Sequence, residues 1–318
     1  MRALITGAAG QDGTLLSEEL LALNWDLVGT KLASEVLSED YPLYGSQVEI
    51  LDITDFDSVK RVVASAKPEV IFHLAGISSV GFSIENPELT KSVNVGGVEN
   101  FLKVLSDAQF SNIHFINAAT VEIYDAAKGV ITESSSLEPQ SPYAQSKSEG
   151  YLLCRAARQT GLPTTNAILS NHESYLRPVE FVTGKIANGV ARISLGLDTR
   201  IELGNIDVAK DWCSARDIVA GLVSIASKQF VGDVILASGE STNLTEIIRE
   251  AFSYVGIENW HDYITFKESL IRKDERREIR IDPSLAKREL DWSTTTPLRD
   301  WVGEMVQHHL DSLGESVH

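Results

Sequence analysis

Tyr143 and Lys147, in the stretch SPYAQSK, stand four residues apart and therefore lie on one face of a helix. A phenol has a pKa of about 10, so it acts as a base near neutral pH only where a cation stabilises its phenolate. Lys147 is suitably placed for this role and for binding the ribose of a nicotinamide cofactor. The pair predicts a hydride-transfer site; the alternative is an exposed tyrosine and lysine on a solvated helix.

A second polar motif, ATVEIY, follows an apolar run and places Thr120 two residues before Glu122. We expect Thr120 to end a strand at the carboxyl edge of a parallel sheet, where doubly wound folds bind ligands. Thr120, Tyr143 and Lys147 would together form the hydride-transfer site. A simple reductase needs a hydroxyl at such a place, but it gives the neighbouring carboxylate no role. The alternative for Glu122 is a solvated loop acid.

Gly7, Gly10 and Gly13, in TGAAGQDG, follow an apolar strand directly and open a helix. Small residues at such a place let the backbone approach a pyrophosphate at the helix N-terminus, where amide donors and the helix dipole favour anions. The spacing G-x-x-G-x-x-G favours the short-chain dehydrogenase/reductase variant of this motif; the alternative is an ordinary glycine turn. Asp52 and Ile53, at the end of a later strand, would flank the adenine.

The elements that must position these residues alternate between two periodicities. Apolar runs such as RALIT, EVIFHLA and NIHFINA alternate with stretches of helical period such as GTLLSEELLALN and SVKRVVASA. This βαβ repetition predicts a Rossmann-type, doubly wound parallel sheet in an α/β protein. We expect a dinucleotide-binding domain formed by residues 1–169 and about 214–240. The remaining residues, about 170–213 and 241–318, would form a smaller, interleaved sugar-nucleotide-binding domain.

Composition restricts the class of protein further. The chain has 318 residues, 43% of them hydrophobic, and a formal net charge of -17, which disfavours nucleic acid and anionic membranes as partners. No apolar run approaches the roughly 20 residues of a membrane span, and the N-terminus lacks the features of a secretory signal, so we expect a cytoplasmic protein. Cys154 and Cys213 are too few and too far apart for a disulfide framework or a thiolate metal cluster, and no metal site is expected.

Seven stretches, spread from the first strand nearly to the C-terminus, share their motifs with a known family. They are ALITGAAGQDGTLL, ATVEIY, SPYAQSK, SNHESYLRPVEFVTGKI, RISLGL, LGNIDVAKDWCSARDIV and DPSLAKRELDW. These stretches resemble the extended short-chain dehydrogenase/reductases, and most of all the GDP-mannose 4,6-dehydratases. The patterns NHES–FVTxKI and LGNxD–DW–ARD are the most specific, because relatives that act on other sugar nucleotides differ there. The resemblance implies GDP-mannose as the substrate and GDP-4-keto-6-deoxymannose as the product.

The resemblance also gives Glu122 a role. In the family resembled, hydride leaves C4 of the sugar for the cofactor, a carboxylate takes the newly acidic C5 proton, water departs from C6, and hydride returns to C6. By position, Tyr143 would be the base at the C4 hydroxyl, and Thr120 would hydrogen-bond that oxygen. Glu122 would remove the C5 proton and assist the loss of water, which is a step that a reductase does not need.

The resemblance further implies which residues bind the two ligands. The residues expected at the cofactor are Gly7, Gly10, Gln11, Asp12, Gly13, Lys31, Asp52, Ile53, Leu74, Ala75, Gly76, Ser78, Tyr143, Lys147, His172 and Arg177. The residues expected at the substrate are Ser79, Asn171, Val182, Lys185, Gly204, Lys210, Arg272 and Glu275. Lys210 stands where the family tends to have arginine, so its phosphate contact would lack bidentate geometry. Arg272 and Glu275 lie in a weakly matching stretch, IRKDERREI.

Three departures from the family pattern affect the predictions. The stretch TKLASE keeps only Lys31 as a cation where the family has paired arginines, yet no acidic residue ends the strand as in many NAD enzymes. We therefore expect NADP, with NAD as the alternative. A much shorter connection after this stretch predicts a homodimer, formed through the helices beginning near Pro87 and Pro142, with a tetramer as the alternative. Gly76 stands where an alanine is usual.

Two other functions stay open. The first is a related enzyme with the same glycine loop and Tyr/Lys pair, such as a reductase of the GDP-4-keto-6-deoxy sugar or another nucleotide-sugar dehydratase or epimerase; the NHES stretch and Thr120 speak against the reductase. The second is a non-catalytic NADP-binding sensor, a class in which the Tyr/Lys pair is often degraded. The pair is intact here, so the sequence favours the dehydratase.

Overall fold

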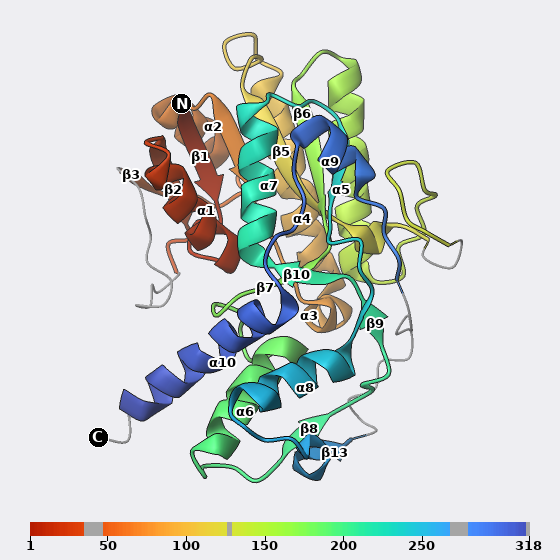
Figure 1. The fold of residues 1–318 in the computed structure, drawn as a ribbon. Helices are drawn as coiled ribbons and strands as arrows, with labels where there is room; N and C mark the ends of the chain where they lie inside the picture. The colour runs from red at the N-terminus through yellow and green to blue at the C-terminus, as the bar shows by residue number, and fades with distance from the viewer. Residues whose placement is uncertain (35–46, 126–128, 268–278, 316–318) are drawn as a thin grey trace. The chain divides into compact units, whose positions relative to one another are not determined.

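Seven parallel strands form the central sheet in the computed structural model, which describes residues 1–34, 47–125, 129–267 and 279–315 (Figure 1). The strands are β1 (Arg2–Thr6), β2 (Asp26–Lys31), β3 (Gln47–Ile50), β4 (Val70–His73), β5 (His114–Thr120), β6 (Thr164–Leu169) and β11 (Asp233–Leu236). Their order across the sheet is β11-β6-β5-β4-β1-β2-β3. Strands β4, β5 and β6 are buried along their whole length, so their sequences lack the polar alternation of a half-exposed sheet.

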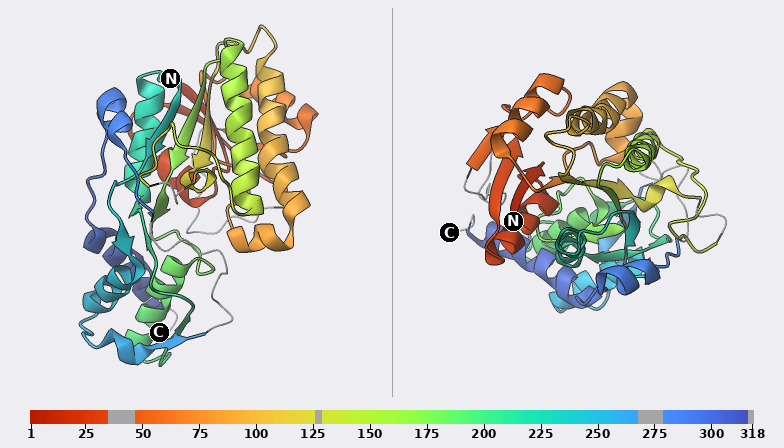
Figure 2. Two further views of the ribbon diagram at one scale, coloured as in Figure 1. Left: turned by 90° about the vertical axis from the view of Figure 1, so that its right-hand side faces the viewer. Right: turned by 90° about the horizontal axis from the view of Figure 1, so that it is seen from above.

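Helices cover both faces of this sheet (Figure 2). On one face lie, side by side, α2 (Phe56–Ala66), α4 (Pro87–Leu105) and α5 (Pro142–Gln159). On the other face lie α1 (Gln11–Ala22) and α7 (Ala215–Ser227). Two shorter helices, α3 (Val80–Glu85) and α9 (Ser284–Leu290), belong to the same part of the chain. The predicted doubly wound parallel sheet is confirmed.

Local sequence explains where the principal helices begin. The Asp55 carboxylate accepts a hydrogen bond from the Asp57 amide at the start of α2, and the Ser141 hydroxyl accepts one from the Ala144 amide at the start of α5. Pro142 is the first residue of α5, where its missing N–H has no intrahelical partner to lose. The start of α5 is thus fixed close to Tyr143.

The strand order reverses between β1 and β4, which pair with Thr6 beside His73. Doubly wound sheets bind ligands beyond the carboxyl ends of the strands at such a switch point. Three segments leave these ends: the glycine-rich loop after β1, the loop after β4, and the 3-10 turn η1 (Val121–Ile123) after β5. All three contain residues that the sequence singled out.

The chain divides into two compact units, each built from three segments. The first contains Met1–Ser170, Ile218–Leu236 and Asp282–Ser293; the second contains Asn171–Asp217, Ala237–Ile281 and Thr294–His318. The sequence placed residues 241–318 together in the second domain, whereas Asp282–Ser293 groups with the first unit. The reason is long-range packing: Trp292 is buried, and a Cβ on Gly221 of α7 would lie 3.1 Å from its ring.

The second unit consists of short strands and helices. Its elements are β7 (Asn171–Glu173), α6 (Val182–Ser194), β8 (Ile201–Leu203), β9 (Ala209–Lys210), β10 (Trp212–Ser214), β12 (Thr242–Asn243), α8 (Leu244–Tyr254), η3 (Trp260–Tyr263), β13 (Ile264–Phe266) and α10 (Leu298–Glu315). The strands pair as β7 with β10 and β8 with β13, both parallel, and β9 with β12, antiparallel.

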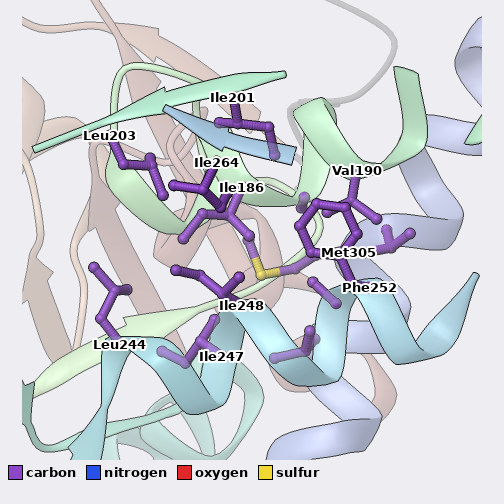
Figure 3. Packing of buried hydrophobic residues seen from close by; sticks show 14 of the residues in the cluster. Ile186, Val190, Ile201, Leu203, Leu244, Ile247, Ile248, Phe252, Ile264 and Met305 are labelled. Atoms are coloured by element: carbon purple, nitrogen blue, oxygen red, sulfur yellow. The ribbon is translucent and has the colours of Figure 1, made fainter. Parts of the chain in front are cut away.

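Apolar side chains from α6, α8, α10 and the β8–β13 pair meet in the core of the second unit (Figure 3). Ile186, Ile248 and Phe252 are fully buried there, and Met305 lies between α6 and α8. Replacing Phe252 by alanine would cost about 3–5 kcal/mol of stability, as is usual for a buried phenylalanine. The second unit therefore has a core of its own.

No helix in the described part of the chain is both long and apolar enough to cross a membrane.

Candidate active site

The glycine-rich loop after β1 is closed so tightly that two of its glycines cannot bear a side chain. Gly7 has φ +69°, and a Cβ on it would lie 2.9 Å from the Ala75 amide nitrogen. A Cβ on Gly13 would lie 2.3 Å from the Gly7 carbonyl oxygen. The Gly10 amide donates to that same oxygen at 3.0 Å. The backbone is thereby exposed at the N-terminus of α1, as close approach of a pyrophosphate requires.

A buried hydrogen-bonded bridge joins this loop to the loop after β4. The Thr6 hydroxyl accepts a hydrogen bond from the Ala75 amide at 3.1 Å and lies 3.0 Å from His73 Nδ1. Burial, and secondarily the Lys147 charge, lowers the pKa of His73 to about 3, so this imidazole is neutral at physiological pH. These bonds therefore fix the loop after β4, with Leu74 and Ala75, against the glycine loop on one side of the switch point.

Lys147 reaches from α5 to the end of β5. Its ammonium donates a hydrogen bond to the Ala118 carbonyl oxygen at 2.9 Å, two residues before Thr120. Burial lowers the pKa of Lys147 to about 8, and the Asp12 carboxylate opposes this shift. The ammonium is thus a cation at neutral pH that lies close to its own titration range.

Gly76 leaves room for this arrangement. A Cβ on Gly76 would lie 2.8 Å from Asn94 Oδ1 and 3.6 Å from Lys147 Nζ. Asn94, buried in α4, accepts a hydrogen bond from the Ile77 amide at 2.8 Å and donates to the Ile77 carbonyl at 3.0 Å and to the Ser146 hydroxyl at 2.9 Å. The loop after β4 is thus held to α4 and α5 through an asparagine near Lys147.

The turn that contains Tyr143 is held on both sides. The Tyr143 amide donates to the buried Ser83 hydroxyl at 3.1 Å, and the Ser146 hydroxyl donates to the Tyr143 carbonyl at 2.7 Å. Sequence reasoning identified Tyr143 and Lys147 but missed Asn94 and Ser83. A polar residue within the apolar helical stretch SVNVGGVENFL was the available signal for Asn94.

Thr120 and Glu122 belong to one local structure. Thr120 is the last residue of β5 and is 7% exposed; its hydroxyl oxygen accepts a hydrogen bond from the Glu122 amide at 3.3 Å and so caps η1. Glu122 is partly exposed in that turn. The structure therefore brings Thr120, Glu122 and Lys147 to the carboxyl end of β5, with Tyr143 one helical turn before Lys147 on α5.

The residues expected at the adenosine end of a cofactor lie at the ends of β2 and β3. Lys31 is the last residue of β2, and its carbonyl accepts a hydrogen bond from the Leu51 amide at 3.0 Å. The exposed Asp52 accepts from the Thr54 amide at 2.9 Å, and the Ile53 carbonyl accepts from Asn100 at 2.9 Å. Ser78 lies exposed in the loop after β4, and the Ser79 hydroxyl caps α3.

Most of the predicted substrate residues lie in the second unit, and so do His172 and Arg177, which were predicted to contact the cofactor. Arg177 is engaged there: its Nε donates to the buried Glu173 carboxylate at 2.7 Å, which also accepts from Thr183 at 2.7 Å, and its guanidinium donates to the His172 carbonyl. Arg177 also lies 4.7 Å from the Phe181 ring centroid. This ion pair, which sequence reasoning did not anticipate, fixes the NHES stretch to the start of α6.

The other predicted residues of this unit are distributed over its strands and helices. Val182 begins α6 and Lys185 lies in its first turn, while Lys210 lies in β9 beside Thr242. Asn171 begins β7 and donates to the Asp211 carbonyl at 3.3 Å, and Gly204 directly follows β8. The substrate predictions Arg272 and Glu275 fall outside the described residues.

The residues at the switch point of the first unit are of the kinds that hold a dinucleotide. The described ranges contain no group of three or more His, Cys, Asp or Glu side chains that could hold a metal ion. A dinucleotide fits the switch point of the first unit, because the glycine loop offers backbone where any Cβ would clash and Lys147 places a cation at the end of β5.

Comparisons with known proteins agree with this arrangement. A family model described as GDP-mannose 4,6 dehydratase matches residues 4–305. The GDP-mannose 4,6-dehydratase of Sinorhizobium fredii is 32% identical over 341 aligned residues, which cover 98% of this chain and 97% of that protein. GDP-mannose 4,6 dehydratase 1 of Arabidopsis thaliana is 30% identical, with 97% of this chain and 90% of that protein covered.

Solved structures share the fold over the whole chain. RMD from Pseudomonas aeruginosa, solved in complex with NADPH, matches with a TM-score of 0.83 at 22% identity, covering 98% of this chain and 99% of that one. dTDP-glucose 4,6-dehydratase from Bacillus anthracis, solved in complex with NAD, matches with a TM-score of 0.83 at 18% identity, covering 99% and 98%. At these identities the likeness establishes the Rossmann-type fold.

Proposed function

The chain belongs to the GDP-mannose 4,6 dehydratase family, and from this premise we propose that it converts GDP-mannose to GDP-4-keto-6-deoxymannose with loss of water. The observation that carries the proposal is the capped turn at the end of β5. There, Thr120 and Glu122 are joined by a hydrogen bond of 3.3 Å, so that a hydroxyl suited to a sugar oxygen and a carboxylate suited to a neighbouring proton share one turn.

Tyr143, Lys147 and Thr120 would act at the C4 hydroxyl of the sugar. Tyr143 takes the hydroxyl proton, and the Lys147 ammonium favours the phenolate that Tyr143 needs for this. The Thr120 oxygen accepts from the Glu122 amide, so its own proton is oriented for donation to the C4 oxygen. A nicotinamide cofactor, when bound, accepts the hydride from C4 and returns it to C6.

Glu122 would act at C5, and only after C4 has become a ketone, because the carbonyl is what makes the C5 proton acidic. Its carboxylate removes that proton, and the resulting carboxylic acid donates a proton to the departing C6 hydroxyl. Water leaves and Glu122 returns to its ionised form. C5 takes up a proton as hydride arrives at C6, and Tyr143 gives up the proton that it took from the C4 hydroxyl, so the proton balance closes within one turnover. Substrate protons therefore pass through two residues with separate tasks, Tyr143 and Glu122.

We propose NADP as the cofactor, with Lys31 at the end of β2 as the cation for the 2′-phosphate. The relatives and neighbours leave this choice open by themselves, since RMD was solved with NADPH and dTDP-glucose 4,6-dehydratase with NAD. The absence of an acidic residue at the end of β2 supports NADP, because such a residue would repel the phosphate.

Ser79 and seven residues of the second unit would bind the substrate or the cofactor. We propose that Ser79, Asn171, Val182, Lys185, Gly204 and Lys210 contact GDP-mannose, and that His172 and Arg177 contact the cofactor. The buried Glu173 supports the last of these, since it fixes the Arg177 guanidinium by a 2.7 Å hydrogen bond and so lowers the entropy lost on binding.

We also propose that the protein is a homodimer formed through α4 and α5. Leu89 on α4 and Leu152 on α5 are 50% and 47% exposed, which supports an apolar contact on these helices. Sedimentation of the wild type and of Leu89→Glu/Leu152→Glu tests this: the charged variant should be monomeric. An unchanged mass would place the interface elsewhere.

The test of the proposed activity is to supply the purified protein with GDP-mannose and no added reductant. A dehydratase forms the 4-keto product and consumes no external NADPH, because the hydride is returned within each turnover. A reductase would consume one NADPH for each 4-keto sugar supplied, and a cofactor-binding sensor would form no product. Absence of any 4-keto product with GDP-mannose would refute the dehydratase activity.

A further inference from the structure

A series of buried polar side chains runs from the turn that contains Glu122 (η1), hereafter the Glu122 turn, into the interior of the first unit. Tyr124, which directly follows η1, is 0% exposed, and Tyr151 on α5 is 1% exposed. Their rings meet edge to face at a centroid distance of 6.4 Å with the two hydroxyls interacting, and the Tyr124 hydroxyl also lies 3.5 Å from the Glu133 carbonyl oxygen. The Tyr151 hydroxyl donates to Asp233 Oδ2 at 3.2 Å and accepts from Arg155 at 3.4 Å.

Asp233, the first residue of β11, fixes the far end of this series. Its Oδ1 accepts hydrogen bonds from Arg158 at 2.7 Å and from Asn166 of β6 at 2.8 Å. Asn166 in turn accepts from Asn117 of β5 at 2.9 Å. Tyr124 is thereby connected through Tyr151 to the side of the sheet formed by β5, β6 and β11.

Neither tyrosine is suited to proton transfer. Burial raises the pKa of both phenols, and the neighbouring Tyr151 and Asp233 raise that of Tyr124 further. Phenylalanine would fill the same space without the cost of burying a hydroxyl. The two hydroxyls add a polar connection between the Glu122 turn and α5.

We propose that Tyr124 is a positioning residue that ties the Glu122 turn, through Tyr151, to α5 and thereby sets the distance between Glu122 and Tyr143. Tyr151 lies one helical turn beyond Lys147, on the same side of α5, so the link ends next to the residues that act at C4. This inference rests on the proposed function, in which Glu122 and Tyr143 act at adjacent carbons of one sugar.

Loss of the Tyr124 hydroxyl affects the Glu122 turn selectively. The Tyr143 turn is held independently by the Ser83 hydroxyl at 3.1 Å and the Ser146 hydroxyl at 2.7 Å, and Lys147 is held by Ala118. The Glu122 turn retains its cap and a backbone bond from Glu138 to Ile123 at 2.9 Å, so it stays folded. We therefore expect slower removal of the C5 proton by Glu122, with hydride transfer from C4 unchanged.

The experiment compares Tyr124→Phe and Tyr151→Phe with the wild type. A misplacement of about 1 Å costs about 100-fold in rate, so formation of the 4-keto product should fall by roughly 10- to 100-fold with KM little changed. Because hydride transfer persists, absorbance of reduced nicotinamide should accumulate during turnover in both variants. The control, Tyr254→Phe, removes an exposed hydroxyl bonded to Gln307 and should match the wild type.

Amide hydrogen exchange provides a readout that does not depend on activity. In Tyr124→Phe, the amides of residues 122–125 should exchange faster than in the wild type, while those of 143–150 should not change. Unchanged exchange in the turn would overturn the proposal, and so would a rate loss without accumulation of reduced nicotinamide. If the wild type itself forms no 4-keto product, the dehydratase activity fails, and the exchange data still test the positioning role.

Discussion

The Lys147 ammonium is hydrogen-bonded to the Ala118 carbonyl at 2.9 Å, so α5 and the strand that ends at Thr120 are joined by a charged contact. The contact holds the ammonium at the end of β5, one helical turn after Tyr143, and away from bulk water. This ammonium therefore titrates closer to neutrality than that of an ordinary lysine.

Activity should decline on the alkaline side because of this lysine. Its pKa is lowered to about 8, so the ammonium is fully charged below that pH and loses its proton as the pH rises through it. Profiles of kcat/KM against pH should show the decline near pH 8. In Lys147→Arg, whose guanidinium does not titrate, the decline should move to higher pH at a lower maximal rate. An unmoved decline would assign it to another group.

Glu122→Gln should stop the reaction after its first chemical step. Tyr143 and Lys147 are retained, so hydride still leaves C4 and reduced nicotinamide absorbance appears, but product formation should fall by about 10²–10⁴-fold. In deuterated water the wild type should place deuterium at C5, while the hydrogen from C4 arrives at C6 as protium. Glu258→Gln, an exposed carboxylate, is the control. Near-normal product formation by Glu122→Gln would mean that Glu122 is a solvated loop acid with no role in the reaction.

Tyr143→Phe should fail differently, since it lacks the base for the first step. It should show neither reduced nicotinamide nor product, which single-turnover absorbance measurements can separate from the Glu122→Gln result. Appearance of reduced nicotinamide in this variant would assign the first base to another residue.

Lys31→Glu should weaken NADP binding far more than NAD binding, because only NADP has a phosphate at the ribose 2′ position. Calorimetric titration of both cofactors measures the difference, and Lys60→Glu, on exposed helix surface, provides the same charge change as a control. Equal weakening of the two affinities, or a wild type that prefers NAD, would remove the case for NADP.

Acid should destabilise the fold through buried histidines. Burial lowers the pKa of His114 to about 4, so the folded state excludes a proton that the unfolded chain binds below about pH 6.5. Stability from this group is complete above pH 6.5 and is lost as the pH falls toward 4. The expected loss from pH 7 to 5 is about 2 kcal/mol. Urea unfolding of wild type and His114→Gln at both pH values should show a smaller loss in the variant.

The sequence predicted the sheet because its determinants are local. The buried strands lack the polar alternation of a half-exposed sheet, and the need for glycine at position 13 arises from contact with the Gly7 carbonyl in the same loop. The grouping of Asp282–Ser293 was beyond such reasoning, because it depends on Trp292 meeting Gly221, a residue far away in the chain.

Residue type and spacing suffice to propose Tyr143 and Lys147 as site residues, and the structure places Lys147 at the end of β5. Asn94 and Ser83 were missed because their role is to hold backbone groups of distant segments, which no spacing within their own helices reveals. The same holds for Glu173, whose buried carboxylate is recognisable only once Arg177 and Thr183 are seen beside it.

The division of each unit into three segments has a consequence for synthesis of the chain. Strand β6 pairs with β11 along one edge, yet β11 leaves the ribosome only after α6 and α7 have been made. Until then the nascent chain presents β6, a strand destined for full burial, as an open edge that can pair with other chains. The first unit closes only when Trp292 emerges, so a product terminated before that residue lacks a completed core and exposes apolar surface.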